Sequence, residues 1–343
     1  MKPVIPYFFF LMLLCVLRSE AQQSDYSIVP LVKAPISSIR GLSVVSDSVL
    51  WVSGTQGMVG RSVDGGKEWK WMKITGCDSC DWRDIEAFSA NRAVIINAGE
   101  PTHIFLTKDG GTTWQKVYFN NTKGIFYDGM DFWNDQEGIA VGDPLGGVFS
   151  LLKTSNGGES WQPFPINPPP VTEGEASFAA SGTTIRSLGG KSFVFVSGGA
   201  ASRLFSFNGT SWKVHNTPLI QGESSTGAFS IAFSNDRRGI AVGGDYRRDT
   251  LRTNNCFMTK DGGATWEAPS TPPLGFRSSV EYIRPQLLIA TGTSGTDISE
   301  NGGIHWHNIS REGYHVVRKA KRGEKVFLAG GNGRIAVLLS KEQ

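Results

Sequence analysis

The chain has 343 residues and a formal net charge of +3, with 42 glycines and 10 tryptophans but only 19% charged residues. So many glycines exclude a helical bundle or a coiled coil, because each one inside a helix costs about 1 kcal/mol, and the aromatic and apolar content excludes a disordered chain. The small net charge does not indicate a nucleic-acid partner, so a large, turn-rich β protein remains.

The first 21 residues have the pattern of a signal peptide. Lys2 supplies the positive charge, Val4–Leu17 is almost wholly apolar, and Ser19 and Ala21 are small residues at the −3 and −1 positions of a cleavage site. An apolar run of about 14 residues is too short for a membrane span. We therefore expect an exported protein, periplasmic or secreted, whose residues 22–343 form a single domain without a transmembrane anchor.

Three cysteines follow the signal peptide: Cys77, Cys80 and Cys256. In an oxidising compartment, Cys77 and Cys80 are candidates for a small disulfide loop. Their C-x-x-C spacing also occurs in redox-active dithiols, but those lie at a helix N-terminus, and no helical pattern surrounds this pair. We favour a structural or incidental pair. Four zinc ligands are not available nearby, so we expect no metal site, and Cys256 is expected to be buried or unpaired.

The strongest signal is an eight-residue motif, first seen as Ser62–Trp69, with Asp or Asn in third place, a Gly-Gly pair and a final Trp. Further copies are Thr107–Trp114, Thr154–Trp161, Thr259–Trp266 and Ser299–Trp306, and Ser206–Trp212 is a degenerate copy that is one residue short. The acidic or amide residues of the six copies are Asp64, Asp109, Asn156, Asn208, Asp261 and Asn301. The copies recur every 40 to 54 residues or so, which is the period of propeller blades.

The motif is explained by turn chemistry. Asp or Asn bonds its own turn backbone, and a Gly-Gly pair adopts positive φ without steric cost. The Trp then starts the next strand as a large apolar plug between neighbouring sheets. We therefore predict a structural role for these six residues.

Four short strands accompany the first motif, at Ile39–Val45, Val49–Ser53, Met58–Ser62 and Lys70–Ile74. Four strands per repeat are typical of a propeller blade. Further inner strands are predicted at Arg83–Phe88, Gly129–Trp133, Ser177–Ala180, Phe229–Phe233, Ser279–Ile283 and His315–Lys319. The six motifs are thus accompanied by seven inner strands, which predicts seven blades. The last blade has no motif and no outer strand after it, and Ser27–Val32 is expected to supply that strand. This pairing would close the ring and remove exposed sheet edges.

With these motifs, the chain resembles the BNR/Asp-box propellers and, among them, the photosystem II stability/assembly factor family. Bacterial relatives in that group are often labelled oxidoreductase or sialidase-like. The segments that carry the resemblance are Ile39–Val45, Arg83–Phe88, Asp128–Trp133, Phe178–Thr183, Phe229–Phe233 and Gly239–Asp245. The resemblance implies the propeller fold and a role in assembly, but a propeller is a scaffold that hosts many activities.

Polar residues on the inner strands and on the loops opposite the Asp boxes are the candidate binding residues. They are Arg40, Arg83, Asp84, Glu86, Asp128, Asp131, Glu175, Asp245, Arg247, Arg277, Tyr282 and His315, with Tyr246 and Arg248 on the same loops. Carboxylates and arginines that converge on one funnel favour a polar or anionic ligand, such as a glycan or a peptide carboxylate. Alternatively, these charges pair with each other to satisfy their burial.

The alternative function is a sialidase-like glycoside hydrolase, with Asp84, Glu86 and Tyr282 as candidate catalytic residues. Sialidases have six blades rather than seven, and their arginine motif ends in Ile-Pro, whereas Gly41 and Leu42 follow Arg40. An oxidoreductase is not indicated, because the dinucleotide motif G-x-G-x-x-G and a metal-grade His cluster are missing.

The sequence therefore predicts a non-catalytic binding or assembly scaffold that takes a protein complex or a glycan as its ligand. We expect a monomer that needs no cofactor.

Overall fold

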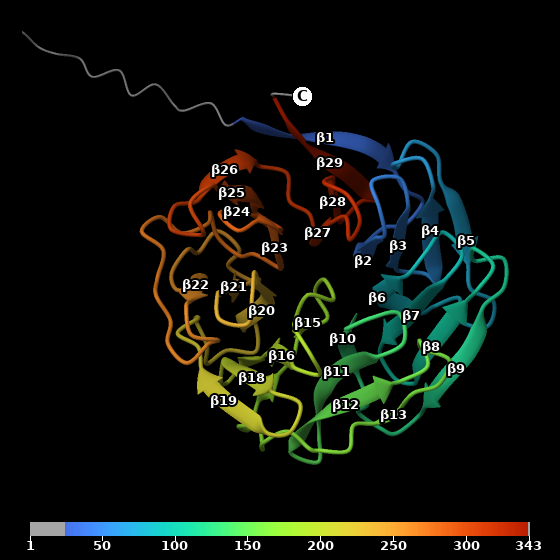
Figure 1. Ribbon diagram of the computed structural model, residues 1–343, viewed down its shortest axis with the longest axis horizontal. Helices are drawn as coiled ribbons and strands as arrows, with labels where there is room; N and C mark the ends of the chain where they lie inside the picture. The colour runs from blue at the N-terminus through green and yellow to red at the C-terminus, as the bar shows by residue number, and fades with distance from the viewer. Residues whose placement is uncertain (1–24, 342–343) are drawn as a thin grey trace, which may run out of the picture.

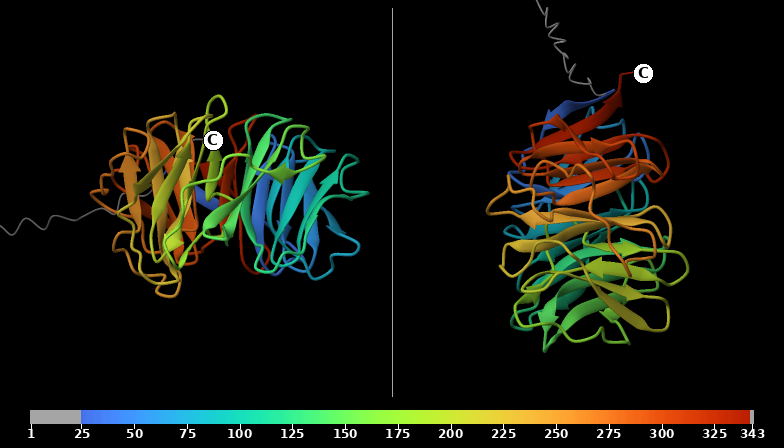
Figure 2. Two further views of the ribbon diagram at one scale, coloured as in Figure 1. Left: turned by 90° about the horizontal axis from the view of Figure 1, so that it is seen from below. Right: turned by 90° about the vertical axis from the view of Figure 1, so that its left-hand side faces the viewer.

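The computed structural model describes residues 25–341, and within this range it contains strands and turns but no helix. Seven antiparallel sheets stand around a central axis (Figure 1). Side views show that the strands run roughly along this axis (Figure 2). The predicted all-β, seven-bladed propeller is confirmed. The predicted signal peptide, residues 1–21, lies outside the described residues.

The first three blades follow each other along the chain, and each contributes its first strand to the inner side of the ring. Blade 1 consists of β2 (Ile39–Val44), β3 (Leu50–Gly54), β4 (Met58–Ser62) and β5 (Lys70–Lys73). Blade 2 consists of β6 (Asp81–Ala87), β7 (Ala93–Ala98), β8 (Thr102–Thr107) and β9 (Gln115–Asn120). Blade 3 consists of β10 (Tyr127–Phe132), β11 (Gly138–Leu145), β12 (Val148–Thr154) and β13 (Gln162–Pro163).

The remaining blades complete the ring. Blade 4 consists of β15 (Ile185–Ser187), β16 (Phe193–Val196), β18 (Arg203–Phe207) and β19 (Trp212–Asn216). Blade 5 consists of β20 (Thr226–Phe233), β21 (Gly239–Asp245) and β22 (Cys256–Thr259), and the short strands β14 (Glu175–Ala176) and β17 (Gly198–Gly199) extend its inner side. Blade 6 consists of β23 (Ser279–Arg284), β24 (Leu287–Gly292), β25 (Gly295–Ser299) and β26 (His307–Ser310). Blade 7 consists of β27 (Val316–Lys319), β28 (Val326–Ala329) and β29 (Arg334–Ser340). Within residues 25–341, no helix is long and apolar enough to cross a membrane.

The N-terminal strand closes the ring as predicted. β1 (Tyr26–Lys33) pairs antiparallel with β29, so the last blade takes its fourth strand from the start of the described chain (Figure 1). This pairing hides the outer edge of β29, which would otherwise offer unpaired backbone groups to other chains.

One predicted inner strand is wrong. Ser177–Ala180 does not form the inner strand of blade 4, which is β15 instead. The segment from Ser177 to Thr184 leaves the sheet because Gly182 adopts a φ of 66° and because Phe178 stacks on Phe229 of blade 5, with ring centroids 3.8 Å apart. Both features oppose an extended strand at this place.

The Asp boxes form the turns between the third and fourth strands. In the first box, the Asp64 carboxylate accepts hydrogen bonds from the backbone N–H groups of Lys67 (3.0 Å) and Glu68 (3.1 Å). The Ser62 hydroxyl donates to the same carboxylate and accepts the N–H of Gly66 (2.9 Å). Gly65 and Gly66 have φ values of 80° and 88°, a conformation that glycine adopts without a steric penalty.

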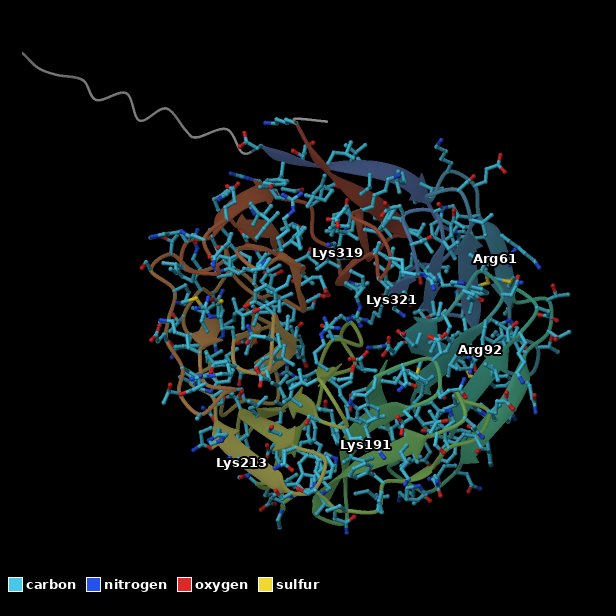
Figure 3. The ribbon with its side chains drawn as sticks, in the orientation of Figure 1. Arg61, Arg92, Lys191, Lys213, Lys319 and Lys321 are labelled. Carbon is cyan, nitrogen blue, oxygen red and sulfur yellow. A yellow bond between two sulfur atoms is a disulfide. The ribbon has the colours of Figure 1, made fainter. Side chains whose placement is uncertain are left out.

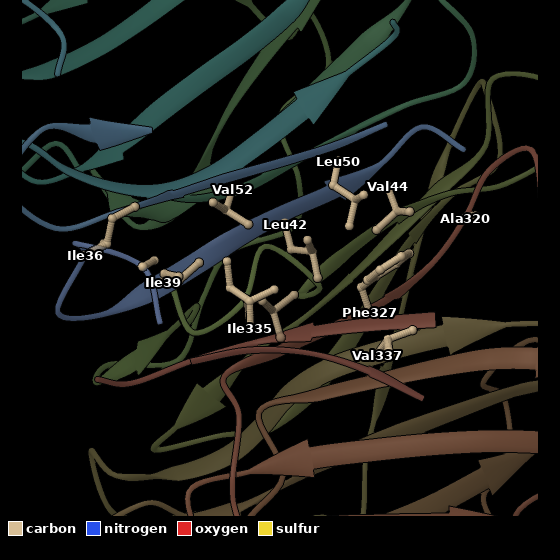
Figure 4. Packing of buried hydrophobic residues seen from close by; sticks show 13 residues of the cluster. Ile36, Ile39, Leu42, Val44, Leu50, Val52, Ala320, Phe327, Ile335 and Val337 are labelled. Atoms are coloured by element: carbon tan, nitrogen blue, oxygen red, sulfur yellow. The ribbon is translucent and has the colours of Figure 1, made fainter. Parts of the chain in front are cut away.

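Apolar clusters between neighbouring blades form the core. The cluster between blades 1 and 7 joins Leu42 and Val52 to Phe327 and Ile335, all buried (Figure 4). The box residue Trp69 packs against this cluster. Blade-to-blade packing thus fixes the ring and positions the inner strands around the axis.

Candidate binding site

A segment of the chain crosses the central channel. Residues 177–184 precede β15 and reach into the middle of the ring (Figure 1). Their backbone carbonyls accept hydrogen bonds from Arg40 of blade 1, to Ala180 at 3.0 Å, and from Arg83 of blade 2, to Ala179 at 2.8 Å. The Ser181 hydroxyl donates to the carbonyl of Ser278 beside blade 6, at 2.7 Å. We call residues 177–184 the plug segment, because it is bonded to inner residues on several sides of the channel.

Two cavities lie at opposite ends of the channel, and the plug segment lines one of them. One has a volume of about 280 Å³ and contacts the chain where the inner strands begin, as at Arg40, Arg83 and His315. The other, of about 420 Å³, contacts the chain where they end, as at Phe88 and Lys321. The Asp boxes follow the third strands and so lie at the second end. We therefore name the two the loop-side cavity and the box-side cavity.

Aromatic rings form one wall of the loop-side cavity. Phe178 of the plug segment stacks on Phe229, and Phe276 meets Phe229 edge-on with a centroid distance of 4.7 Å. Tyr246 stands at the rim with 44% of its surface exposed, 6.1 Å from the Phe229 ring. This wall offers flat apolar surface together with one phenol that reaches solvent.

Cationic groups face this wall. Arg40 and Arg83 are partly buried, and each donates through Nη1 to the plug segment. The Nε of Arg83 also donates to the Asp81 carboxylate at 2.5 Å, which leaves Nη2 of Arg83 for a ligand. Burial, and then the repulsion of Arg83, lower the pKa of Arg40 to about 10, so it is charged at neutral pH. A pair of guanidiniums that retain free N–H groups is suited to binding a carboxylate.

His315 lies beside them as a neutral group. Burial, and then the charge of Arg40, lower its pKa to about 3. Its Nδ1 lies 3.2 Å from the carbonyl of Ile39, a contact that a protonated Nδ1 makes as a donor. The tautomer assigned in this way leaves Nε2 as an acceptor, so the positive charge of the cavity comes from the two arginines.

Two predicted acidic residues lie near the loop-side cavity but do not line it. Asp84 and Asp128 are each 1% exposed. Asp84 accepts the N–H groups of Ile85 and Met130, both at 2.8 Å. Burial raises the pKa of both carboxyls, and Asp143 raises that of Asp128 further. Through the N–H of Met130, Asp84 joins β6 to β10, and neither carboxyl lines the loop-side cavity.

Glu86 and Asp131 correct the prediction of a single binding face, because they line the box-side cavity. Lys321, labelled beside the central opening in Figure 3, bonds the Glu86 carboxylate and the carbonyl of Ala87. Asp131 accepts the N–H of Ser187 at 2.6 Å. Each inner strand runs from the loop-side end of the channel to the box-side end. Arg83, near the start of β6, therefore lines the loop-side cavity, whereas Glu86, three residues later, lines the box-side cavity.

Three more predicted ligand residues are buried or paired within the protein and do not line either cavity. Arg277 is fully buried and paired with Asp297, and Glu175 is 4% exposed and paired with Arg203. Tyr282 packs against the cluster between blades 5 and 6, and burial raises its pKa to about 12. Of the candidate glycosidase residues, Asp84 and Glu86 thus lie two residues apart on β6, whereas Tyr282 packs between blades 5 and 6.

The loop after β21 carries the other two predicted residues. Asp245 is buried and bonds Arg248 at 2.6 Å, which holds the loop that presents Tyr246. Arg247 lies 5.9 Å from the Tyr246 ring centroid. Both therefore support the rim of the loop-side cavity.

The aromatic wall was not predicted from the sequence. The candidates came from the polar residues of the inner strands and nearby loops, whereas Phe178, Phe229 and Phe276 also line the cavity. A large aromatic residue at the start of an inner strand, where the channel offers no partner sheet to cover it, would have been the available signal.

The cysteines lie apart from both cavities. The structure joins Cys77 and Cys80 in a disulfide, with Cα atoms 5.2 Å apart, in the loop between β5 and β6. Cys256 is free and buried.

Comparisons with known proteins agree with this architecture. Residues 20–125 match the family described as photosynthesis system II assembly factor YCF48. No curated protein matches the chain. Similar solved structures include YCF48 bound to D1 peptide, at 15% identity and a TM-score of 0.64, with 92% of this chain and 96% of that chain covered.

Two further structures show how widely the fold is shared. YCF48 from Cyanidioschyzon merolae is 16% identical, with a TM-score of 0.63 and coverage of 93% and 100% of the two chains. The Pan2 WD40 domain of Neurospora crassa is 11% identical, with the same TM-score and coverage of 93% and 96%. The resemblance predicted from the repeats is therefore confirmed: the chain is a seven-bladed Asp-box propeller that is similar, over residues 20–125, to the photosystem II assembly factor YCF48 family.

Proposed function

We propose that this protein is a non-catalytic assembly scaffold that binds a peptide segment of a partner protein in the loop-side cavity. The observation that carries the proposal is the pairing of an aromatic wall, Phe178, Phe229 and Phe276, with Arg40 and Arg83 across one cavity. The similar YCF48 structure that holds a D1 peptide supports a peptide as the ligand.

The size and chemistry of the cavity define what it accepts. About 280 Å³ is near the lower end of ligand pockets, so it holds one or two side chains rather than a folded segment. A carboxylate from an acidic residue or a chain terminus would pair with the arginines. An adjacent apolar side chain would cover the phenyl rings.

A display library of random peptides with free C-termini, screened against the purified chain, tests this. We expect selected peptides to carry a carboxylate next to an apolar residue. Arg40→Gln and Tyr246→Ala should each weaken a selected peptide at least tenfold, which is about 1.4 kcal/mol. Arg237→Ala, an exposed arginine on the turn after β20, is the matched control and should leave affinity unchanged.

Two results would contradict the proposal. If Arg40→Gln binds the selected peptide as tightly as wild type does, the loop-side cavity is not the binding site. A ligand found only on a glycan array would replace the peptide with a sugar.

Export is part of the same proposal. The signal pattern of residues 1–21 predicts a mature, monomeric chain of residues 22–343 in the periplasm or medium. Mass spectrometry of the protein recovered from that compartment should give Gln22 as the first residue, and size-exclusion chromatography should give the mass of one chain. An intact N-terminus would contradict the export prediction.

A further inference from the structure

The Cys77–Cys80 disulfide faces a third side chain with metal-ligating chemistry. The cysteines lie in the loop between blades 1 and 2, and His103 projects from β8, the third strand of blade 2. One atom from each of Cys77, Cys80 and His103 forms a group in which all atoms lie within 4.8 Å of one another. None of the three residues lines either cavity, so the inference does not depend on the proposed peptide function.

The imidazole ring of His103 is buried, and one of its nitrogens makes no hydrogen bond within the described residues. It is 9% exposed, and its Nδ1 is buried with no hydrogen-bond partner within residues 25–341. The rings of Phe105 and Phe119 lie 6.1 Å and 5.2 Å from its centroid, so its surroundings are apolar. Buried polar atoms are normally satisfied, and an imidazole with an unsatisfied nitrogen, lying beside two sulfurs, points to a ligand at this place.

The two cysteines can be reached from solvent. Cys77 is 5% exposed and Cys80 is partly exposed, so small reagents reach the pair from the Cys80 side.

We propose that Cys77, Cys80 and His103 form a redox-gated site for a borderline-soft divalent cation such as Zn²⁺, which the chain binds only when the disulfide is reduced. A dithiol reductant gives two electrons and two protons to the disulfide and becomes a disulfide itself, leaving two cysteine thiols. Metal binding then releases both thiol protons, and two thiolates and one imidazole coordinate the ion. Three protein ligands and one open position are a known arrangement for zinc.

The geometry allows this exchange with small movements. Zn–S bonds of about 2.3 Å place two sulfurs of a tetrahedral site about 3.8 Å apart, so the sulfurs need only separate once their bond is broken. Oxidation reverses the process, because the same sulfurs cannot be bonded to each other and to the ion. The site would release its metal when its surroundings become oxidising.

The experiment uses the full chain, reduced with a phosphine that becomes phosphine oxide, and Co²⁺ as the optical probe. We expect thiolate-to-cobalt absorption and tetrahedral visible bands that saturate at one Co²⁺ per chain and disappear on adding Zn²⁺. The oxidised chain should bind at least 100-fold more weakly. Cys77→Ser with Cys80→Ser should abolish the absorption, and His103→Gln should weaken binding at least tenfold. His305→Gln, an exposed histidine on blade 6, is the control.

Two results would overturn the site. One is a reduced wild-type chain without thiolate-to-cobalt absorption, and the other is His103→Gln with wild-type affinity. Zinc-edge X-ray absorption of the wild-type complex gives an answer even where a variant fails to fold. Two sulfur neighbours and an imidazole support the site, and a shell without imidazole contradicts it.

Discussion

Arg277 is an arginine whose bonds are all made inside the protein. Its Nε donates to Asp297 at 2.6 Å, and its Nη1 donates to the carbonyl of Phe276 at 2.7 Å and to the Ser294 hydroxyl at 2.9 Å. Both members of the ion pair are fully buried. It thus ties the approach to β23 to the hairpin between β24 and β25.

Arg277→Ala should therefore destabilise the fold without acting on ligand binding directly. Removing one member of a buried ion pair leaves an uncompensated charge and costs about 3 to 5 kcal/mol. Denaturant unfolding measures this, with Arg284→Ala, an exposed arginine at the end of β23, as control. An unfolding free energy within 1 kcal/mol of wild type, roughly the effect of a surface substitution, would contradict the buried assignment.

His315 predicts a pH dependence of stability. Its native pKa of about 3 lies below the ordinary histidine value of 6.5, so between these values the unfolded chain binds a proton that the native chain does not. The stability of the fold should fall as pH drops through this window, by up to about 1.4 kcal/mol per pH unit from this residue.

His315→Asn tests this, because the Asn amide can donate to the carbonyl of Ile39 in place of Nδ1 but does not titrate. Urea unfolding from pH 7 to pH 4 should show a shallower loss for this variant than for wild type. His305→Asn should follow wild type. If the unfolding free energies of wild type and His315→Asn fall in parallel from pH 7 to pH 4, His315 does not cause the loss of stability in acid.

At the scale of elements, the Asp boxes explain which strands were predictable. Each box fixes the end of a third strand and the start of a fourth, so strands at a set distance from a complete box, such as β3 and β4, were placed correctly. The box of blade 4 is one residue short, and the plug segment before β15 is rich in small residues. Local pattern cannot reveal that such a segment leaves its sheet and bonds to other blades.

The same reasoning applies to the candidate site. Arg40, Arg83 and His315 were predictable because each lies at or just before the start of an inner strand. Arg277 was not distinguishable from them, since its partner Asp297 is 20 residues away and becomes a neighbour only in the folded blade. The aromatic wall depends on the plug segment, which brings Phe178 onto Phe229.

The plug segment should be sensitive to a single added methyl group. Gly182 has a φ of 66°, and a Cβ there would lie 2.2 Å from a carboxylate oxygen of Asp84. Gly146 has nearly the same φ, 65°, with no atom within 4 Å of its Cβ position. Gly146→Ala should cost about 1 kcal/mol from backbone strain, and Gly182→Ala about 1 to 3 kcal/mol more from overpacking.

Thermal or urea unfolding of the two variants separates strain from contact, because the backbone term is common to both. Gly182→Ala should also weaken a peptide bound in the loop-side cavity, since Ala179, Ala180 and Phe178 of the plug segment line it. Equal unfolding free energies for the two variants would mean that the plug segment is not packed against Asp84.

At the scale of the whole molecule, ring closure depends on one strand. β1 pairs with β29 along its length, and its side chains serve two interfaces. Tyr26 and Ile28 pack against the cluster that joins blades 6 and 7, whereas Leu31 and Val32 pack against the cluster that joins blades 7 and 1. The strand therefore fastens blade 7 to both of its neighbours.

A chain that begins at Ala34 should fold less stably and associate with itself, because it exposes the edge of β29 and both clusters. A synthetic peptide of residues Tyr26–Lys33 should raise its unfolding temperature in a concentration-dependent way. At a free peptide concentration of 100 times its Kd, the unfolding free energy should rise by about 2.7 kcal/mol. A peptide with Ile28→Lys and Leu31→Lys should fail, because it keeps the backbone pairing but buries charge at both interfaces. If the shortened chain unfolds at the wild-type temperature and stays monomeric, β1 is not needed to hold the ring closed, and the five blade interfaces without β1 residues are sufficient.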